Sequence, residues 1–242
     1  MAPPTLLSRT PLRKASSAVA VSALALSLTV AGTIPFTAAY AGDNDHLTVA
    51  TESHVDSPKV FWDSQKGTFT LNSEFRGKDL PIESTVNWVG KGYSSGSSRS
   101  QQYVFHVGNS PRLAFLGNAG DALYMAPSAP QGGSKPIWAG FGADSSIPIE
   151  KFRDGAFSLD IIDFNGPGRM EMFQWGQFAW GEDVPATRLL SSHDKGLRSA
   201  WIEPGNHTHN YTTFTKPGTY TVTYRATARG TDGSLILSLI HI

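Results

Sequence analysis

The chain of 242 residues contains no cysteine. A disulfide framework is therefore excluded, and any metal site must use nitrogen and oxygen ligands instead of thiolates. Lysine plus arginine and aspartate plus glutamate number 20 each, so the formal net charge is zero. Because no basic stripe follows the N-terminal segment, the sequence offers no electrostatic basis for binding nucleic acid.

The usual catalytic signatures are also missing. The sequence has no nucleophile elbow, no glycine-rich phosphate loop before a helix and no His-Glu-x-x-His motif. A copper polysaccharide monooxygenase would need histidine at its mature N-terminus, where Gly42 is expected. We therefore predict that the protein is not an enzyme. A hydrolase with paired carboxylates stays open, because aspartate and glutamate are scattered through many loops.

The N-terminal segment has the layout of a secretory signal peptide. Arg9, Arg13 and Lys14 precede the apolar run "AVAVSALALSLTVAG", and the small-x-small sequence Ala39-Tyr40-Ala41 follows it. We expect residues 1–41 to be removed on export, so that the protein is secreted. The alternative is an uncleaved membrane anchor, which the cleavage site disfavours. No later apolar run is long enough to span a bilayer.

Short apolar–polar alternations dominate the remaining chain. In "GTYTVTYRATA", Tyr220, Val222, Tyr224 and Ala226 occupy one face, and Thr219, Thr221, Thr223 and Arg225 occupy the other. A period of two is typical of a strand that is buried on one side. About a dozen such segments, separated by Gly, Pro, Asn, Asp or Ser, predict an all-β, antiparallel β-sandwich, immunoglobulin-like or jelly-roll-like. We expect one domain over residues 44–236.

The C-terminal sequence "LSLIHI", residues 237–242, breaks the polar pattern before it. It resembles the translation of an adaptor used to make sequencing libraries. We interpret it as an artefact at a truncated end, so that the natural chain and any membrane anchor would continue beyond it. The alternative is a genuine short apolar tail.

Histidine is the residue type that best nominates a site. His54 and Asp56 are two residues apart, as are His207 and His209, so each pair would share one strand face. His193 lies beside Asp194 in a turn-like stretch. These five residues predict a divalent metal site, with zinc first and manganese, iron or copper as alternatives: His54, Asp56, His193, His207 and His209. From residue types alone, each histidine can equally be an ordinary polar residue at a strand end. His106 lies in an apolar strand and is expected to be a core histidine.

The six tryptophans allow a different function. Exposed aromatic rings on a secreted sandwich could stack on sugars. Most of the tryptophans lie in alternating segments, where core packing is the commoner role, and Trp180 in "FAWGED" is the best loop candidate. The alternative prediction is a structural or adhesive module that binds wall glycan through such rings.

The stretch "PGNHTHNYTTFTKPGTYTVTYRATA" resembles the terminal signature of the actinobacterial surface-anchored protein domain, found in choice-of-anchor M proteins. The matching residues include a Gly-x-His-x-His turn, an aromatic Phe-Thr-x-Pro-Gly-x-Tyr run and an alternating strand. Upstream, "SHVDSPKVFWD" and "FNGPGRMEMFQWG" are similar to the opening and central segments of that family. The tryptophan that often follows His-x-His is replaced here by Asn210-Tyr211.

The resemblance implies an exported protein of the cell surface or cell wall. Members of the family usually carry an anchor, and their genes tend to accompany a metal-type ABC transporter. The resemblance therefore implies metal ABC transporter components, or the cell wall itself, as partners. It implies no catalysis. Our leading hypothesis is a non-enzymatic surface protein that binds a divalent metal or a metal-bearing ligand.

Overall fold

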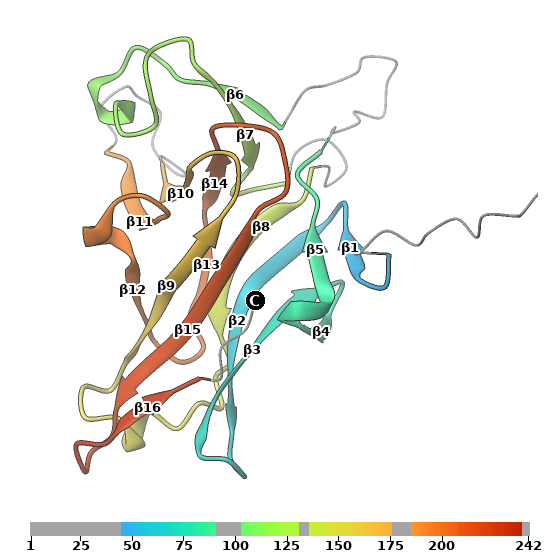
Figure 1. Ribbon diagram of the computed structural model, residues 1–242. Helices are drawn as coiled ribbons and strands as arrows, with labels where there is room; N and C mark the ends of the chain where they lie inside the picture. Colours follow the sequence, from blue (N-terminus) through green and yellow to red (C-terminus); the bar gives the residue numbers. More distant parts are fainter. Residues whose placement is uncertain (1–44, 91–102, 131–135, 176–184, 239–242) are drawn as a thin grey trace, which may run out of the picture. The chain divides into compact units, whose positions relative to one another are not determined.

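The computed structural model describes residues 45–90, 103–130, 136–175 and 185–238. These residues form strands and four short 3-10 turns, with no α-helix among them (Figure 1). Within the same ranges, no helix is long and apolar enough to cross a membrane. The predicted all-β class is therefore confirmed. The expected signal peptide, residues 1–41, lies outside the described residues.

The chain divides between Gly42 and Asp43, and all described elements belong to the second unit. The strands are β1 (Thr48–Ala50), β2 (His54–Asp63), β3 (Thr68–Phe75), β4 (Lys78–Pro81), β5 (Thr85–Asn87), β6 (Val104–His106), β7 (Ala122–Ala126), β8 (Trp138–Ala143), β9 (Phe157–Asn165), β10 (Met170–Gln174), β11 (Thr187–Ser191), β12 (Ser199–Ile202), β13 (His207–His209), β14 (Tyr211–Phe214), β15 (Thr221–Arg229) and β16 (Leu235–Leu237). The 3-10 turns are η1 (Ile82–Ser84), η2 (Pro111–Leu113), η3 (Ile149–Lys151) and η4 (Lys195–Leu197). β16 includes Leu237, the first residue of the segment expected to be an artefact.

The strands form four sheets, most of whose pairings are antiparallel. The site sheet has the order β13-β8-β2-β3-β4, and its β2–β8 pair is parallel. A four-stranded sheet has the order β12-β9-β15-β16, and a second five-stranded sheet has the order β11-β10-β14-β7-β6. β1 and β5 form a small parallel pair. β8 therefore lies between β13 and β2, which are far apart in the sequence.

One apolar core joins three of these sheets. Phe69 and Val60 come from the site sheet, Leu159 and Ala226 from the four-stranded sheet, and Met170 from the second five-stranded sheet. All five side chains are buried. The alternation in β15 is confirmed at Tyr224 and Ala226, whereas a register shift after Thr223 also buries that threonine. A bulge changes which face a side chain takes, which a strict period of two does not predict.

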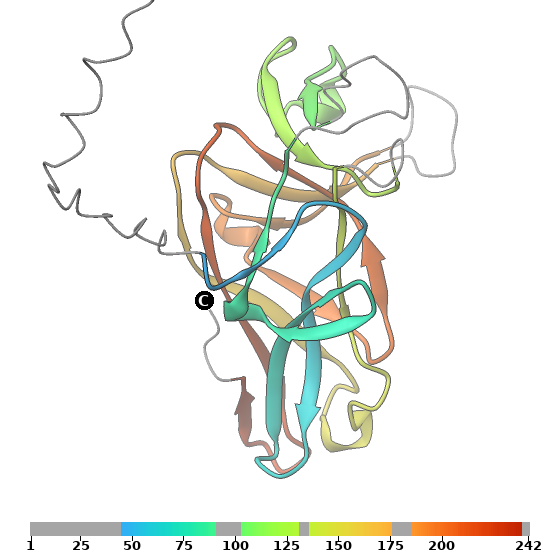
Figure 2. The ribbon, with the colours of Figure 1, turned by 90° about the vertical axis from the view of Figure 1, so that its right-hand side faces the viewer.

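The β2–β3 hairpin is the longest pairing in the site sheet and closes in a tight turn (Figure 2). Asp63 Oδ1 accepts hydrogen bonds from the backbone N–H groups of Gln65 and Lys66, and Gly67 supplies the positive φ that the turn requires. The register of β2 shifts between Asp56 and Lys59, against both β3 and β8. In a regular strand, residues three apart face opposite sides of the sheet. The shift places the side chains of Asp56 and Lys59 on the same side, where both line the pocket described below.

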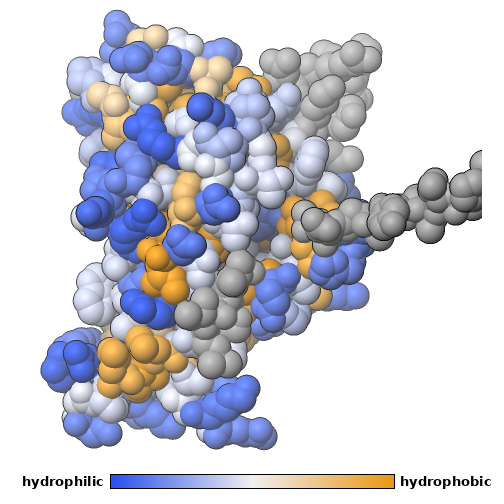
Figure 3. All heavy atoms as spheres, in the orientation of Figure 1, coloured by the Kyte–Doolittle hydropathy of each residue, from blue (hydrophilic) through white to orange (hydrophobic). Residues whose placement is uncertain are grey.

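The four-stranded sheet turns its other face away from the core, toward the viewer in Figure 3. Hydrophobic side chains gather there over the lower ends of β15 and β16, where Leu235 and Leu237 are exposed. Trp201, on the edge strand β12, is 72% exposed. An alternating segment thus carries its tryptophan on the solvent side, contrary to the expectation of core packing. His106, expected in the core, is exposed at the end of β6.

Candidate metal centre

Two flanking strands bring four potential ligands together. His54 is the first and Asp56 the third residue of β2. His207 and His209 are the first and last residues of β13. The strands β2 and β13 flank β8 on its two sides. One ligand atom of each of the four residues lies within 4.8 Å of one ligand atom of every other. The predicted pairing of residues two apart is confirmed in both strands, because alternate side chains of an extended segment share a face.

Glycines in β8 let these side chains meet above the middle strand. Gly140 is in register with both Asp56 and His209, and Gly142 is in register with His207. A Cβ atom on Gly140 would lie 2.2 Å from the Thr208 carbonyl oxygen and 3.1 Å from Asp56 Oδ1. Neither glycine is among the residues singled out from the sequence. Two glycines two apart inside a strand are a signal of close backbone approach, and they could have been found on that basis.

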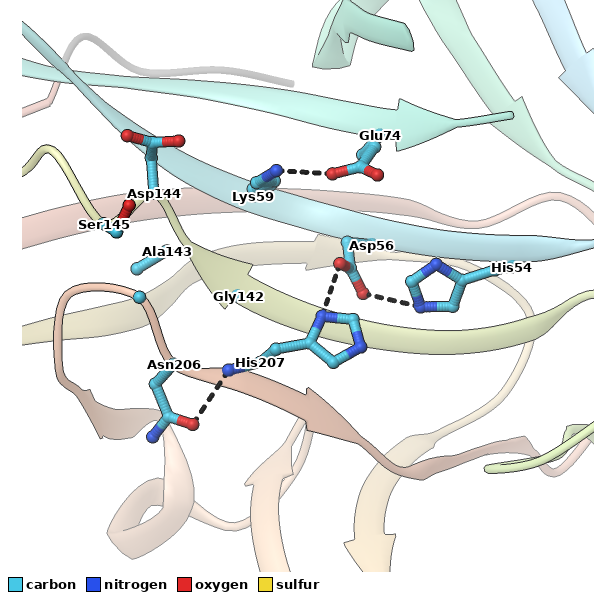
Figure 4. A pocket seen from close by; sticks show the side chains of 11 residues that line it. His54, Asp56, Lys59, Glu74, Gly142, Ala143, Asp144, Ser145, Asn206 and His207 are labelled. Carbon is cyan, nitrogen blue, oxygen red and sulfur yellow. Dashed lines mark hydrogen bonds and ion pairs between the residues drawn. The ribbon is translucent and has the colours of Figure 1, made fainter. Parts of the chain in front are cut away.

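The imidazole nitrogens converge on one another. His209 Nε2 lies 2.5 Å from His207 Nε2 and 3.0 Å from His54 Nε2. The other nitrogen of His207, Nδ1, lies 2.7 Å from Asp56 Oδ2, as in a charge-assisted hydrogen bond (Figure 4). When Nδ1 of the neutral ring donates to the carboxylate, Nε2 carries the lone pair. The carboxylate therefore holds His207 in the tautomer that can coordinate a metal.

Asp56 is the most unusual member of the cluster. Its carboxylate is buried, with 2% of the residue exposed, and among the described residues no lysine or arginine forms an ion pair with it. Oδ1 lies 3.1 Å from His54 Nε2, but it has no hydrogen-bond partner within the described ranges. A buried carboxylate without a direct partner of fixed positive charge is costly, and a bound cation would offset that cost.

The electrostatics of the cluster favour uncharged imidazole at His209. Burial lowers the pKa of His209, and the neighbouring His207 and His54 lower it further, whereas Asp56 acts in the opposite direction. A histidine must be neutral to coordinate a metal. The lowered pKa therefore favours the neutral, ligating form of His209.

An aromatic side chain supports two of the ligands. Trp138, the first residue of β8, is in register with His54, and their ring centroids lie 4.5 Å apart. The same indole meets the His209 ring edge-on at 4.7 Å. It thus restricts both imidazoles, as outer residues commonly do around metal ligands. In the sequence this tryptophan is one of several strand aromatics, and no local pattern connects it with the histidines.

A polar pocket of about 270 Å³ opens beside the cluster. His54, Asp56 and His207 form one wall, and Lys59, Glu74, Asp144, Ser145 and Asn206 contribute to the others (Figure 4). Lys59 donates a hydrogen bond to Glu74. Burial lowers the pKa of Lys59, but the hydrogen bond and charge of Glu74, together with the charges of Asp79 and Asp56, outweigh this effect, so the pKa is raised overall. Hydrogen bonds from Ser146 lower the pKa of Asp144, so the pocket contains charged groups of both signs.

His193 is not part of the cluster, which departs from the predicted ligand set. It follows β11, where Nε2 lies 3.4 Å from Glu171 Oε1 and Nδ1 lies 3.2 Å from Ser191 Oγ. Glu171 is buried and also pairs with Arg188, so His193 belongs to an ion-pair network of the second five-stranded sheet. The pairing of β11 with β10 places it there, and residue type alone could not predict that pairing.

Trp180, the predicted glycan-stacking residue, lies outside the described residues. Comparisons of the chain with protein-family models, with curated proteins and with solved structures found no match. The resemblance to the actinobacterial surface-anchored domain therefore stays a prediction. What the structure establishes is a β-rich domain with a histidine–aspartate cluster that could hold a metal ion.

Proposed function

We propose that this protein binds a divalent metal ion through His54, Asp56, His207 and His209, and that it does so as an exported, non-catalytic protein of the cell surface. Buried Asp56 carries the proposal. One of its oxygens orients His207, and the other has no hydrogen-bond partner among the described residues and lies beside His54 Nε2. Three imidazole nitrogens and one carboxylate oxygen are a donor set that suits divalent transition metals.

The donor set narrows the choice of metal. Because the chain has no cysteine, no thiolate can favour a soft ion. Imidazole suits zinc, copper, iron and nickel, and a carboxylate oxygen extends the range to manganese. Zinc is the first candidate, with manganese, iron and copper as alternatives.

The setting of this site is also part of the proposal. The signal-peptide pattern of residues 1–41 supports export, and the resemblance described above supports attachment to the cell wall and cooperation with a metal ABC transporter. The apolar core shared by the site sheet and the four-stranded sheet supports a β-sandwich that displays the metal site near its surface. Such a protein would capture metal outside the cell without changing it chemically.

Calorimetry of the full chain with Zn²⁺ and with Mn²⁺ tests metal binding. We expect one ion per chain for the unmodified protein and loss of binding in the His207→Ala/His209→Ala double variant. His106→Ala is the matched control, because His106 is an exposed histidine outside the cluster. His193→Ala should also bind normally. Binding that survives the double variant, or that is absent from the unmodified protein, would remove the proposal.

A second candidate function rests on the exposed tryptophans. Trp201 and Trp88 are 72% and 58% exposed, and an exposed indole is the kind of surface on which sugar rings stack. The second candidate is therefore a wall-glycan module. Co-sedimentation with purified peptidoglycan would show binding that is lost in Trp201→Ala. Binding unaffected by Trp201→Ala and Trp88→Ala would eliminate this candidate without affecting the metal site.

A further inference from the structure

The pocket beside the cluster exposes one side of the candidate metal centre. His54, Asp56 and His207 line it, whereas His209 does not. His209 instead lies against the Trp138 ring, which closes that side with an aromatic side chain. An ion held by the four residues would therefore meet protein on the His209 side and open space on the pocket side.

Among the described residues, the cluster supplies four donor atoms. Asp56 Oδ2 accepts the hydrogen bond from His207, so the carboxylate has one oxygen left for a metal. The other three donors are the Nε2 atoms of the histidines. Four donors complete a tetrahedral shell, but an octahedral ion would need two more.

The donors lie closer together than a bound ion would hold them. Two pairs of imidazole nitrogens are 2.5 Å and 3.0 Å apart, and His54 Nε2 lies 3.1 Å from Asp56 Oδ1. For bonds of about 2.0–2.1 Å, adjacent donors are about 3.3 Å apart around tetrahedral zinc and about 3.0 Å apart around an octahedral ion. The histidines must therefore move apart on binding, and their spacing without an ion does not select a geometry. The open side of the centre follows from the pocket instead.

The remaining pocket walls are suited to water and to small polar ligands. Glu74 and Asp144 offer carboxylate oxygens, and Lys59 and Asn206 offer N–H groups. A space of about 270 Å³ is large enough for several water molecules. An apolar ligand would take these charged groups out of water without offering them a hydrogen bond, so the walls disfavour that class.

We infer that the metal centre is open: the bound ion keeps coordination positions that face the pocket, occupied by water and exchangeable for a small anionic donor ligand. This inference rests on the proposed metal binding and adds the coordination state of the ion. A closed structural zinc site holds its metal tightly, with all positions filled by protein. An open site gives incoming ligands direct access to the ion, which suits metal transfer to a partner.

Cobalt spectroscopy of the Co²⁺-loaded full chain tests the inference. Octahedral or five-coordinate Co²⁺ absorbs weakly in the visible region, whereas tetrahedral Co²⁺ absorbs strongly. We expect weak bands that shift when azide is added as the small anionic probe. Ser145→Trp fills the pocket from its exposed rim, and Ser145→Ala is the matched control without added bulk. Ser145→Trp should suppress the azide shift and slow removal of Co²⁺ by a chelator several-fold, and Ser145→Ala should change neither.

The possible outcomes separate the two proposals. Strong tetrahedral bands that azide leaves unchanged, with Co²⁺ still bound, would overturn the open centre and leave metal binding intact. An azide shift and a chelation rate that are the same in Ser145→Trp and Ser145→Ala would show that the pocket is not the access route. Failure of the unmodified protein to bind Co²⁺ would overturn both the open centre and the proposed function.

Discussion

At the scale of single residues, Asp56 combines two functions that are usually divided between residues. Through Oδ2 it accepts a hydrogen bond from His207, and through Oδ1 it would offer a negative donor atom to the proposed ion. A variant of Asp56 without the negative charge would affect metal affinity and folding stability in different ways. A buried carboxylate with one oxygen lacking a hydrogen bond destabilises a fold, whereas a cation needs that negative charge.

We expect Asp56→Asn to lower metal affinity by more than about 100-fold, beyond the 10–100-fold range found when outer partners of metal ligands are lost. The amide oxygen can still accept a hydrogen bond from His207, so the metal-free variant should unfold at the same urea concentration as the unmodified protein or at a higher one. Calorimetry and urea titration measure the two effects. Asp144→Asn, a pocket carboxylate outside the cluster, is the control. Equal affinities for both variants would contradict a ligand role for Asp56.

At the scale of secondary structure, β8 determines whether the two ligand-bearing strands can meet. Gly140→Ala would place a Cβ atom against the Thr208 carbonyl oxygen, so β13 would have to move. We expect a loss of stability of about 1–3 kcal/mol, typical of overpacking, together with weaker metal binding. Gly108→Ala is the control, because its Cβ would approach only Leu113, at 3.8 Å. If Gly140→Ala bound metal with unchanged affinity, the spacing of β13 and β2 would not depend on this glycine.

Tyr224 of strand β15 should make the fold less stable at alkaline pH. Tyr224 lies in the core, and burial raises the pKa of its phenol well above the ordinary value of 10.0. The unfolded chain therefore ionises first, and stability falls as the pH rises above about 10. Below that pH the phenol is neutral in both states and contributes no pH dependence. Tyr224→Phe should flatten this part of the stability–pH curve, and urea unfolding between about pH 9 and 11 would measure it. An unchanged slope would mean that other groups cause the loss.

At the scale of the whole molecule, metal binding should raise thermal stability. An ion that binds only the folded chain adds about 2.7 kcal/mol when its concentration is about 100 times the dissociation constant. For a domain of this size that corresponds to a rise in Tm of roughly 5–10 °C. Calorimetric scans with and without Zn²⁺ measure the shift, and His207→Ala/His209→Ala should abolish it. A shift of the same size in the double variant would place the stabilising ion elsewhere.

The all-β class and the four cluster residues could be predicted from the sequence, because the alternation of side chains along a strand is visible in the residue pattern. His54 and Asp56, like His207 and His209, share a face in any extended segment. The meeting of these two pairs depends instead on the order β13-β8-β2, a long-range pairing without a local signal. The same reason explains His193, which has a suitable side chain but lies beside Glu171 in another sheet. The contact of Trp138 with His54 and His209 also depends on the pairing of β8 with β2 and β13, so the sequence alone does not indicate it.

The ligands also come from distant parts of the chain: His54 and His209 are separated by 155 positions in the sequence. An ion shared between them would act as a cross-link that joins the beginning of the described chain to its final third. In a protein without cysteine, it would take the place that a disulfide holds in many exported domains. Such a cross-link would resist thiol reductants but would open in acid or in a chelator, so local metal supply would set the rigidity of the fold.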